Sequence, residues 1–380
     1  MDRRSLIQTG LGAVAASAFC TRTSGQGAPA AAPAFSLDAF SRNLQWCRTP
    51  QELAKAVIDL GLKTVDLTIA PAPGHVDPAK VRTDLPTFVN GMKAQGITVR
   101  AITTPITGAD SANAEAILDA AAAAGIGYYT WSGIPIDAAA GYQAQVDSLK
   151  ARFSALSKLN QKYRIKGLYQ PKSGMAGGLF LDLLPALQGL DPRYIGIRYD
   201  TASLLQARPE TTTRLLKLGG PYIGGLALND AAVNLEFPKW TQGHFVDAPE
   251  VLLKPSGGGN NTGTAGGNWL AYGGGGRPLP YRYRPMPVGM GMIDLMQIGK
   301  TLKEINFSGP AECQVEYELG GAEKGADKIT LPRQEVIGRI KRDRITVEQA
   351  FREPWGLKVA LPPFMREPGN RPAPAPAGAD

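Results

Sequence analysis

From Phe35 onward, short runs of β-branched and aromatic residues alternate with longer stretches in which apolar residues recur every three or four positions. The short runs predict buried strands, and the longer stretches predict amphipathic helices. Eight strands are expected, at residues 41–46, 64–69, 98–103, 128–132, 167–170, 194–200, 223–229 and 312–316. Helices are expected between them, at residues 50–60, 78–95, 112–124, 142–162, 180–187 and 209–218.

The alternation of strands and helices is typical of a parallel sheet built from βα units, and eight such units fit a closed (β/α)₈ barrel, the TIM barrel. Three of the helices stop at glycines that can adopt the left-handed cap, Gly61, Gly96 and Gly125. A doubly wound sheet would show a glycine-rich loop after its first strand, and residues 46–52 contain no glycine. We therefore predict one α/β domain, a TIM barrel over residues 35–350.

A long insertion, residues 231–287, follows the seventh expected strand and is rich in glycine. Because it leaves the carboxyl end of a strand, it belongs to the face where barrel active sites are built. Its aromatic residues would either form a lid over a sugar or pack on the barrel rim; they are Trp240, His244, Trp269, Tyr272, Tyr281 and Tyr283. Residues 351–380 are expected to be a C-terminal extension with a disordered, Pro/Ala-rich end.

The first residues carry the motif Asp-Arg-Arg-Ser-Leu-Ile at positions 2–7, followed by a short apolar run at 11–19. This pattern predicts a twin-arginine-type signal peptide, residues 1–18, with a cleavage site at Ala16-Ser17-Ala18 and a flexible linker at 19–34. The protein is then expected to be periplasmic or secreted, with no membrane attachment after cleavage. The alternative is an ordinary amphipathic N-terminal helix.

Composition narrows the function classes further. The 380 residues are 43% hydrophobic and 19% charged, and the formal charge of +8 comes from Lys and Arg that are scattered along the chain. The one basic cluster, at 333–344, is interpreted as the solvated face of a terminal helix, so no nucleic-acid partner is expected. Three cysteines are too few for a disulfide framework or a thiolate zinc site. Cys47 and Cys313 fall on strands that a closed barrel makes neighbours, and whether they pair is left open.

Several segments resemble a known family. They are Phe-Ser-Arg-Asn-Leu-Gln-Trp at 40–46, Val-Asp-Leu-Thr at 65–68, Leu-Asp-Pro-Arg-Tyr-Ile-Gly at 190–196, Val-Gly-Met-Gly-Met-Ile-Asp at 288–294 and Val-Glu-Tyr-Glu at 315–318. Together they resemble the sugar phosphate isomerase/epimerase group of the xylose isomerase-like superfamily, over residues 35–325. The resemblance implies a TIM barrel in which carboxylates and a histidine at strand ends hold a divalent metal, while two acidic residues move a proton beside a carbonyl or hydroxyl carbon of a sugar.

Asp200 and Glu316 match acidic ligand positions of the family, so the resemblance implies that they hold a divalent cation such as Mg²⁺, Mn²⁺ or Zn²⁺. The other ligand positions depart from the pattern. Relatives often read Tyr-His-Asn-His-Ser-Gly where this chain reads Tyr-Gln-Pro-Lys-Ser-Gly at 169–174, and the whole chain has two histidines. A histidine-rich metal centre is therefore excluded, and the cation itself is left open.

The candidate catalytic residues are Glu316, Asp200 and Lys172. Carboxylates at strand ends either bind a metal or do acid/base work, the alternative being that they only pair with Lys172 or Arg198. The candidate substrate-binding residues are His75, Trp46, Trp131, Gln170, Asn229 and Asp230. For the two tryptophans the alternative is a core plug, and for Asn229 and Asp230 it is capping of the following turn.

The resemblance, together with the predicted signal peptide, implies an exported isomerase, epimerase or lyase that acts on a free, keto or glycosidic sugar by proton transfer, with or without the assistance of a divalent metal, and with a small carbohydrate as partner. The alternative is a metal-free, catalytically inactive barrel that binds a saccharide or a partner protein.

Overall fold

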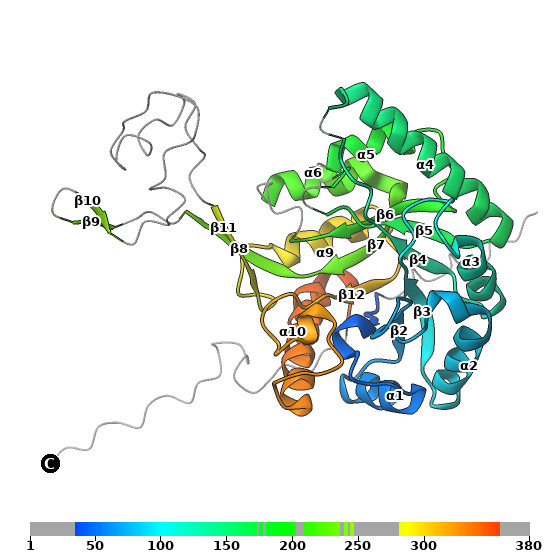
Figure 1. Ribbon diagram of the computed structural model, residues 1–380. Helices are drawn as coiled ribbons and strands as arrows, with labels where there is room; N and C mark the ends of the chain where they lie inside the picture. The colour runs from blue at the N-terminus through cyan, green and yellow to red at the C-terminus, as the bar shows by residue number, and fades with distance from the viewer. Residues whose placement is uncertain are drawn as a thin grey trace, which may run out of the picture. The chain divides into compact units, whose positions relative to one another are not determined.

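The computed structural model describes residues 35–137, 139–172, 175–177, 180–202, 209–235, 239–241, 244–246 and 281–357. Its main sheet has eight parallel strands, in the order β1-β2-β3-β4-β5-β6-β7-β12 (Figure 1). The strands are β1 Ala39–Phe40, β2 Thr64–Thr68, β3 Thr98–Thr103, β4 Tyr128–Trp131, β5 Lys166–Tyr169, β6 Ile195–Asp200, β7 Ile223–Leu228 and β12 Ala311–Cys313. A parallel bridge between Asp38 and Glu312 joins the first strand to the last, so the predicted (β/α)₈ barrel is confirmed.

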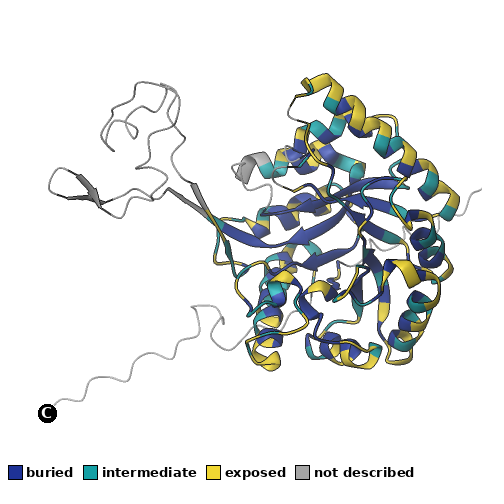
Figure 2. Cartoon of the chain, viewed as in Figure 1, coloured by how far each residue is buried: buried dark blue, intermediate teal, exposed yellow. Residues whose placement is uncertain are grey.

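Helices surround the sheet and bury only the side that faces it, so buried strands lie inside a ring whose outer surface is exposed (Figure 2). The α-helices are α1 Pro50–Asp59, α2 Val81–Ala94, α3 Ala114–Ala123, α4 Tyr142–Tyr163, α5 Phe180–Leu187, α6 Pro209–Gly219, α9 Leu295–Glu304 and α10 Arg333–Trp355. The short 3₁₀ helices are η1 Ser41–Leu44, η2 Pro78–Lys80, η3 Gly220–Tyr222 and η4 Ala322–Lys324. None of the helices in the described part of the chain is long and apolar enough to span a bilayer.

Local sequence signals set the ends of these helices. α1 begins with a capping box, in which the Thr49 side chain accepts the Glu52 N–H and the Glu52 side chain accepts the Thr49 N–H. The predicted glycine stops are confirmed, because Gly61, Gly96 and Gly125 have φ of 76°, 76° and 75°.

Two predicted strands were placed too far along the chain. β1 ends at Phe40 and residues 41–44 form η1, while β12 ends at Cys313 rather than at residue 316. The physical reason lies partly in Asn43, whose side chain donates to the Val315 carbonyl (3.1 Å) and accepts the Val315 N–H (3.1 Å). A short polar side chain thus takes the place of the strand ladder at both strand ends.

The insertion begins as a two-stranded antiparallel ribbon, β8 Asp230–Leu235 with β11 Tyr281–Met286, and a second pair is formed by β9 Lys239–Thr241 and β10 His244–Val246. Trp269 and Tyr272 lie outside the described residues, as do the predicted signal peptide, the linker and the end of the C-terminal extension. The helix α10 runs through the expected domain end at 350 to Trp355. Cys47 and Cys313 are both buried and both free, so they do not form a disulfide in this structure.

The barrel interior is polar at its centre. Arg198, on β6, is fully buried and pairs with Asp66 of β2 (2.9 Å) and with Glu312 of β12. Burial raises the pKa of the Glu312 carboxyl well above its usual value. Tyr199, the residue between Arg198 and Asp200, packs outward against Phe180 of α5, as the alternation of side chains along a strand requires.

Replacing Arg198 with methionine is expected to lower the free energy of unfolding by about 3–5 kcal/mol, because it leaves buried carboxyls without their cation. Urea denaturation of both proteins measures the change. The control is Lys55→Met, which breaks the exposed Lys55–Asp59 pair of α1 and is expected to cost about 0.5 kcal/mol or less. A cost for Arg198→Met no larger than that of the control would contradict the prediction.

Candidate active site

Five polar side chains lie at the carboxyl ends of the barrel strands. Gln170 follows β5, Asp200 ends β6, Asn229 follows β7, and Gln314 and Glu316 follow β12. Because the strands are parallel, these ends meet at one mouth of the barrel, the face on which TIM barrels build active sites. Four residues that the sequence singled out, Gln170, Asp200, Asn229 and Glu316, therefore lie on this face, together with Gln314.

Asp200 is held by a chain of side-chain amides that starts in the barrel centre. The Gln170 Nε2 donates both to Asp200 Oδ2 (2.8 Å) and to Gln314 Oε1 (2.9 Å). The Gln314 Nε2 in turn donates to Glu312 Oε1 (2.6 Å), the oxygen that also pairs with Arg198. These side chains are all buried, so the orientation of Asp200 depends on the buried Arg198, two residues earlier on β6.

Gln314 was missed by the sequence reasoning. The signal that could have found it is the alternation Glu312, Gln314, Glu316, in which Glu312 and Gln314 are buried and Glu316 is exposed at the mouth.

Glu316 is the carboxyl that is open to solvent at the mouth. Its pKa is raised to about 7, first because surrounding protein displaces water from it and second because of the Asp200 charge. The Lys172 charge and a hydrogen bond from the Tyr283 hydroxyl, at 3.4 Å from Glu316 Oε2, act in the opposite direction. Glu316, Asp200, Lys172 and Tyr283 therefore form one electrostatic cluster, which contains all three predicted catalytic residues.

His75 lies in the loop after β2, with its Nε2 3.2 Å from the Ser41 carbonyl and its ring 5.6 Å from that of Phe88. Burial lowers its pKa to about 4, so the imidazole is neutral at physiological pH. His244, the other histidine, lies in β10, and its side chain is outside the described part of the structure.

The two strand-end tryptophans are buried. Trp131 packs edge-on against Phe153 of α4 (5.2 Å between ring centroids) and against Tyr169 (4.8 Å), so it fills the layer between strand and helix. Trp46 is 4% exposed. Both positions match the core-plug alternative, and a stacking role for either ring stays a prediction.

Asp230 holds the loop that follows the insertion. Its carboxylate accepts the N–H groups of Gly289 (2.9 Å), Gly291 (2.9 Å), Ile293 (3.1 Å) and Ala231 (2.9 Å). The loop needs glycine at 291, because a Cβ there would lie 2.1 Å from Asp230 Oδ1. In this structure the predicted substrate-binding Asp230 therefore acts on the loop that follows β11.

Asn229 fixes the loop after β6. Its Oδ1 accepts from the Thr201 hydroxyl (2.9 Å) and from the Ala202 N–H (2.8 Å). Its Nδ2 is buried and has no hydrogen-bond partner among the described residues. The group of Asn229 that has no partner is thus a hydrogen-bond donor, not an acceptor.

The donor set at the mouth does not fit a divalent metal ion. In the part of the chain that the structure describes, no group of three or more His, Cys, Asp or Glu side chains is placed to hold one. Gln170 turns N–H toward Asp200, Asn229 has only its N–H₂ unpartnered, and Lys172 brings an ammonium group. A cation needs oxygen or nitrogen lone pairs. Among the described side chains at the mouth, the anionic ones are the Asp200 and Glu316 carboxylates, and the neutral Tyr283 hydroxyl already donates to Glu316 at 3.4 Å.

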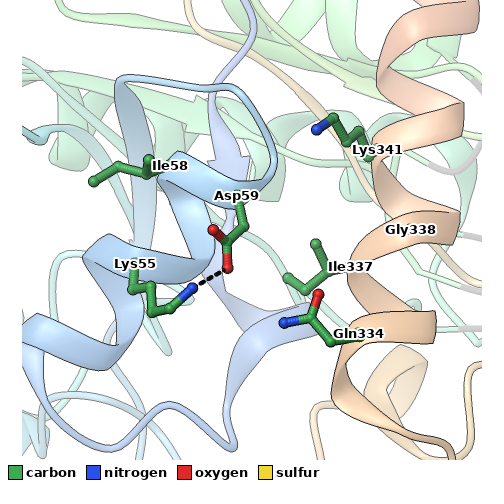
Figure 3. A pocket seen from close by; sticks show the side chains of 7 residues that line it. All are labelled: Lys55, Ile58, Asp59, Gln334, Ile337, Gly338 and Lys341. Atoms are coloured by element: carbon green, nitrogen blue, oxygen red, sulfur yellow. Dashed lines mark hydrogen bonds and ion pairs between the residues drawn. The ribbon is translucent and has the colours of Figure 1, made fainter.

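An open groove of about 490 Å³ also lies between α1 and α10, on the outer ring of helices (Figure 3). α1 contributes Lys55 and Asp59, and α10 contributes Gln334 and Lys341. Its one carboxylate, Asp59, pairs with Lys55 at 2.7 Å, so the groove lacks the facing carboxyls that the barrel mouth has.

The barrel and its mouth define the class of the protein: a TIM barrel with an acidic pair at the carboxyl ends of its strands. The family model described as xylose isomerase-like TIM barrel matches residues 54–331, and the chain belongs to that family. The comparison with curated proteins finds no match.

Three solved structures are similar in fold. The IOLI protein with a bound zinc atom is 12% identical, with a TM-score of 0.56, over 83% of this chain and 99% of that one. A D-tagatose 3-epimerase-like protein is 12% identical, with a TM-score of 0.51, over 83% and 99%. A xylose isomerase-like TIM barrel protein from Mycobacterium smegmatis in complex with magnesium is 13% identical, with a TM-score of 0.50, over 81% and 97%. At this identity the likeness shows the fold.

The Glu316 carboxyl is expected to titrate at about pH 7 in a ¹³C NMR experiment, with Glu316→Gln used to assign its signal. Asp200→Asn should lower this midpoint, and Lys172→Gln should raise it, each by about one pH unit, because the first removes a like charge and the second an opposite charge. A midpoint that moves in neither variant would show that the three groups do not share a site.

Proposed function

We propose that this protein is an enzyme of the isomerase, epimerase or lyase type that moves a proton on a carbon of a sugar. The observation that carries the proposal is the state of the Glu316 carboxyl. It is open to solvent and has a pKa of about 7, which the charge of Asp200 helps to raise. A general acid or base works best when its pKa lies near the working pH, because it can then both accept and return a proton.

In the proposed reaction, the Glu316 carboxylate takes the proton from a carbon that neighbours a carbonyl group. The electron pair of the broken C–H bond moves onto the carbonyl oxygen, where the Lys172 ammonium stabilises the negative charge. For isomerisation, Glu316 returns the proton to the former carbonyl carbon, and the hydroxyl proton of the first carbon moves to the oxygen of the former carbonyl, so that hydroxyl and carbonyl exchange places. For epimerisation, water delivers a proton to the opposite face of the first carbon, the carbonyl forms again, and Glu316 releases its proton to solvent. In a lyase, the electron pair instead expels a leaving group from the next carbon.

Asp200 has a different part in this proposal. It is 1% exposed and is held by Gln170, so it is placed to orient the site and to raise the pKa of Glu316 by its charge. Arg198, which the sequence left as a competing partner for Asp200 and Glu316, pairs with Asp66 and Glu312 instead. This arrangement favours an enzyme over the inactive binding barrel.

A small carbohydrate is the proposed partner, and a free, keto or glycosidic sugar is the proposed substrate class. The family model and the fold likeness to a D-tagatose 3-epimerase-like protein support it. A divalent cation at Asp200 and Glu316 is the cofactor that the resemblance implies and that the sequence leaves open. Because the donor set at the mouth does not fit one, no step of the proposal passes through a metal.

Deuterium incorporation from D₂O into a panel of keto sugars and glycosides tests the proposal. The exchange rate should rise as the pH passes through about 7, because the carboxylate form of Glu316 accepts the proton. Glu316→Gln should lower the rate by about 10²–10⁴-fold, and the matched control Glu318→Gln, an exposed carboxyl two residues along the chain, should leave it unchanged. Exchange by Glu316→Gln at the wild-type rate would contradict the assignment. Saccharide binding without any exchange in the wild type would favour the binding barrel.

We also propose that the chain is exported through its twin-arginine-type signal, so that the mature protein is periplasmic or secreted. The double variant Arg3→Lys/Arg4→Lys should remain unprocessed in the cytoplasm, because the paired arginines are the feature that such export reads. Cell fractionation followed by mass measurement checks this, and Arg22→Lys, beyond the predicted cleavage site, is the control. Export of the double variant at the wild-type level would contradict the proposal.

A further inference from the structure

The amide group of Gln170 has one stable orientation. Its Nε2 lies 2.8 Å from Asp200 Oδ2 and 2.9 Å from Gln314 Oε1, so it faces two acceptors at once. Turning the amide over would set its carbonyl oxygen against both of these oxygens. In a buried site, two such repulsive oxygen–oxygen contacts would make the turned orientation much higher in free energy.

The orientation of Gln314 is fixed by the barrel centre. Its Nε2 donates to Glu312 Oε1, and the same oxygen pairs with the Arg198 guanidinium. A guanidinium has donors only, so Glu312 Oε1 must be an acceptor and Gln314 must present its nitrogen there. Its oxygen is then left for Gln170, and the direction of every hydrogen bond from Arg198 to Asp200 follows.

As a result of this chain of hydrogen bonds, the Gln170 amide turns its N–H group, the positive end of its dipole, toward Asp200. A divalent cation that bound Asp200 on this side would face the Gln170 N–H instead of an oxygen lone pair. The Lys172 charge, which acts on Glu316, would repel the same cation. Asn229 adds a third group of donors, because its Oδ1 is occupied and its Nδ2 is buried without a partner among the described residues.

We infer that this site works without a divalent cation: the buried Gln170–Gln314 pair turns an N–H donor to Asp200 Oδ2, and Lys172 supplies the positive charge at the mouth. The site then recognises the carbonyl and hydroxyl oxygens of a sugar through the exposed Lys172 ammonium group, because both Gln170 Nε2 hydrogens are already donated to Asp200 and Gln314. This inference rests on the proposed function for its ligand class, while the exclusion of metal stands on the hydrogen-bond directions and on the Lys172 charge.

Mn²⁺ binding to the full-length protein, purified without chelator, tests the inference. Isothermal titration and electron paramagnetic resonance should show no site in the wild type tighter than about 1 mM, because two carboxylates beside an ammonium group hold a cation poorly. The double variant Gln170→Glu/Lys172→Gln supplies a third carboxylate and removes the lysine charge. It should bind Mn²⁺ about tenfold more tightly or better, and Asp200→Asn in that background should abolish the gain.

The control is Gln143→Glu on α4. Gln143 donates to Asp147 at 3.0 Å, so this variant makes the same amide-to-carboxylate change at an exposed pair and should gain no site. About one equivalent of Mn²⁺ in the wild type, lost in Asp200→Asn, would overturn the inference. So would a folded double variant, checked by circular dichroism, that binds no better than the control, and if that variant does not fold, the wild-type titration still decides.

Failure of this inference can be told apart from failure of the proposed function. Proton exchange on a sugar that appears only with added Mn²⁺ would overturn the metal-free site and leave the sugar enzyme standing. A wild type that binds no Mn²⁺ and exchanges no proton on any sugar would do the reverse.

Discussion

The buried Arg198 at the centre of the barrel is the constraint on which the rest of the site depends. A guanidinium with no access to water must be surrounded by acceptors, and here Asp66 and Glu312 come from two other strands to provide them. The ion pairs tie β2, β6 and β12 together across the interior. They also make one oxygen of Glu312 a hydrogen-bond acceptor. This sets the direction of the hydrogen bonds that lead from Glu312 to the mouth of the barrel.

The direction of the hydrogen bonds at the mouth is therefore set by the buried ion pairs in the core. Two glutamine side chains carry the hydrogen-bond direction from the buried ion pairs to Asp200, the inner of the two carboxyls at the mouth. Asp200 in turn raises the pKa of Glu316, the outer one, which is open to solvent. The two carboxyls have different roles because their environments differ. Asp200 is held in a buried hydrogen-bond network, and Glu316 is accessible to a ligand.

Membership of the xylose isomerase-like TIM barrel family settles the fold but leaves the chemistry to individual residues. Two structures that share this fold carry zinc or magnesium. In this chain, Gln170, Asn229 and Lys172 line the same kind of mouth with donors, and the acceptors that remain are carboxylates.

The sequence by itself determined the barrel, because eight short apolar runs alternating with amphipathic helices leave few other ways to bury the strands, and glycines such as Gly61 mark the helix ends locally. It also indicated Asp200, Glu316 and Lys172, since strand ends of a parallel barrel must meet at one face. Tertiary structure alone decided what these residues do. The ends of β1 and β12 depend on a bond from Asn43 to Val315, and Asp230 became a loop anchor because the glycines at 289 and 291 return to it from the far end of the insertion. The position of Gln314 between Glu312 and Gln170 likewise joins residues more than a hundred positions apart, and the direction of a hydrogen bond is set by its partners in space, which no local pattern records.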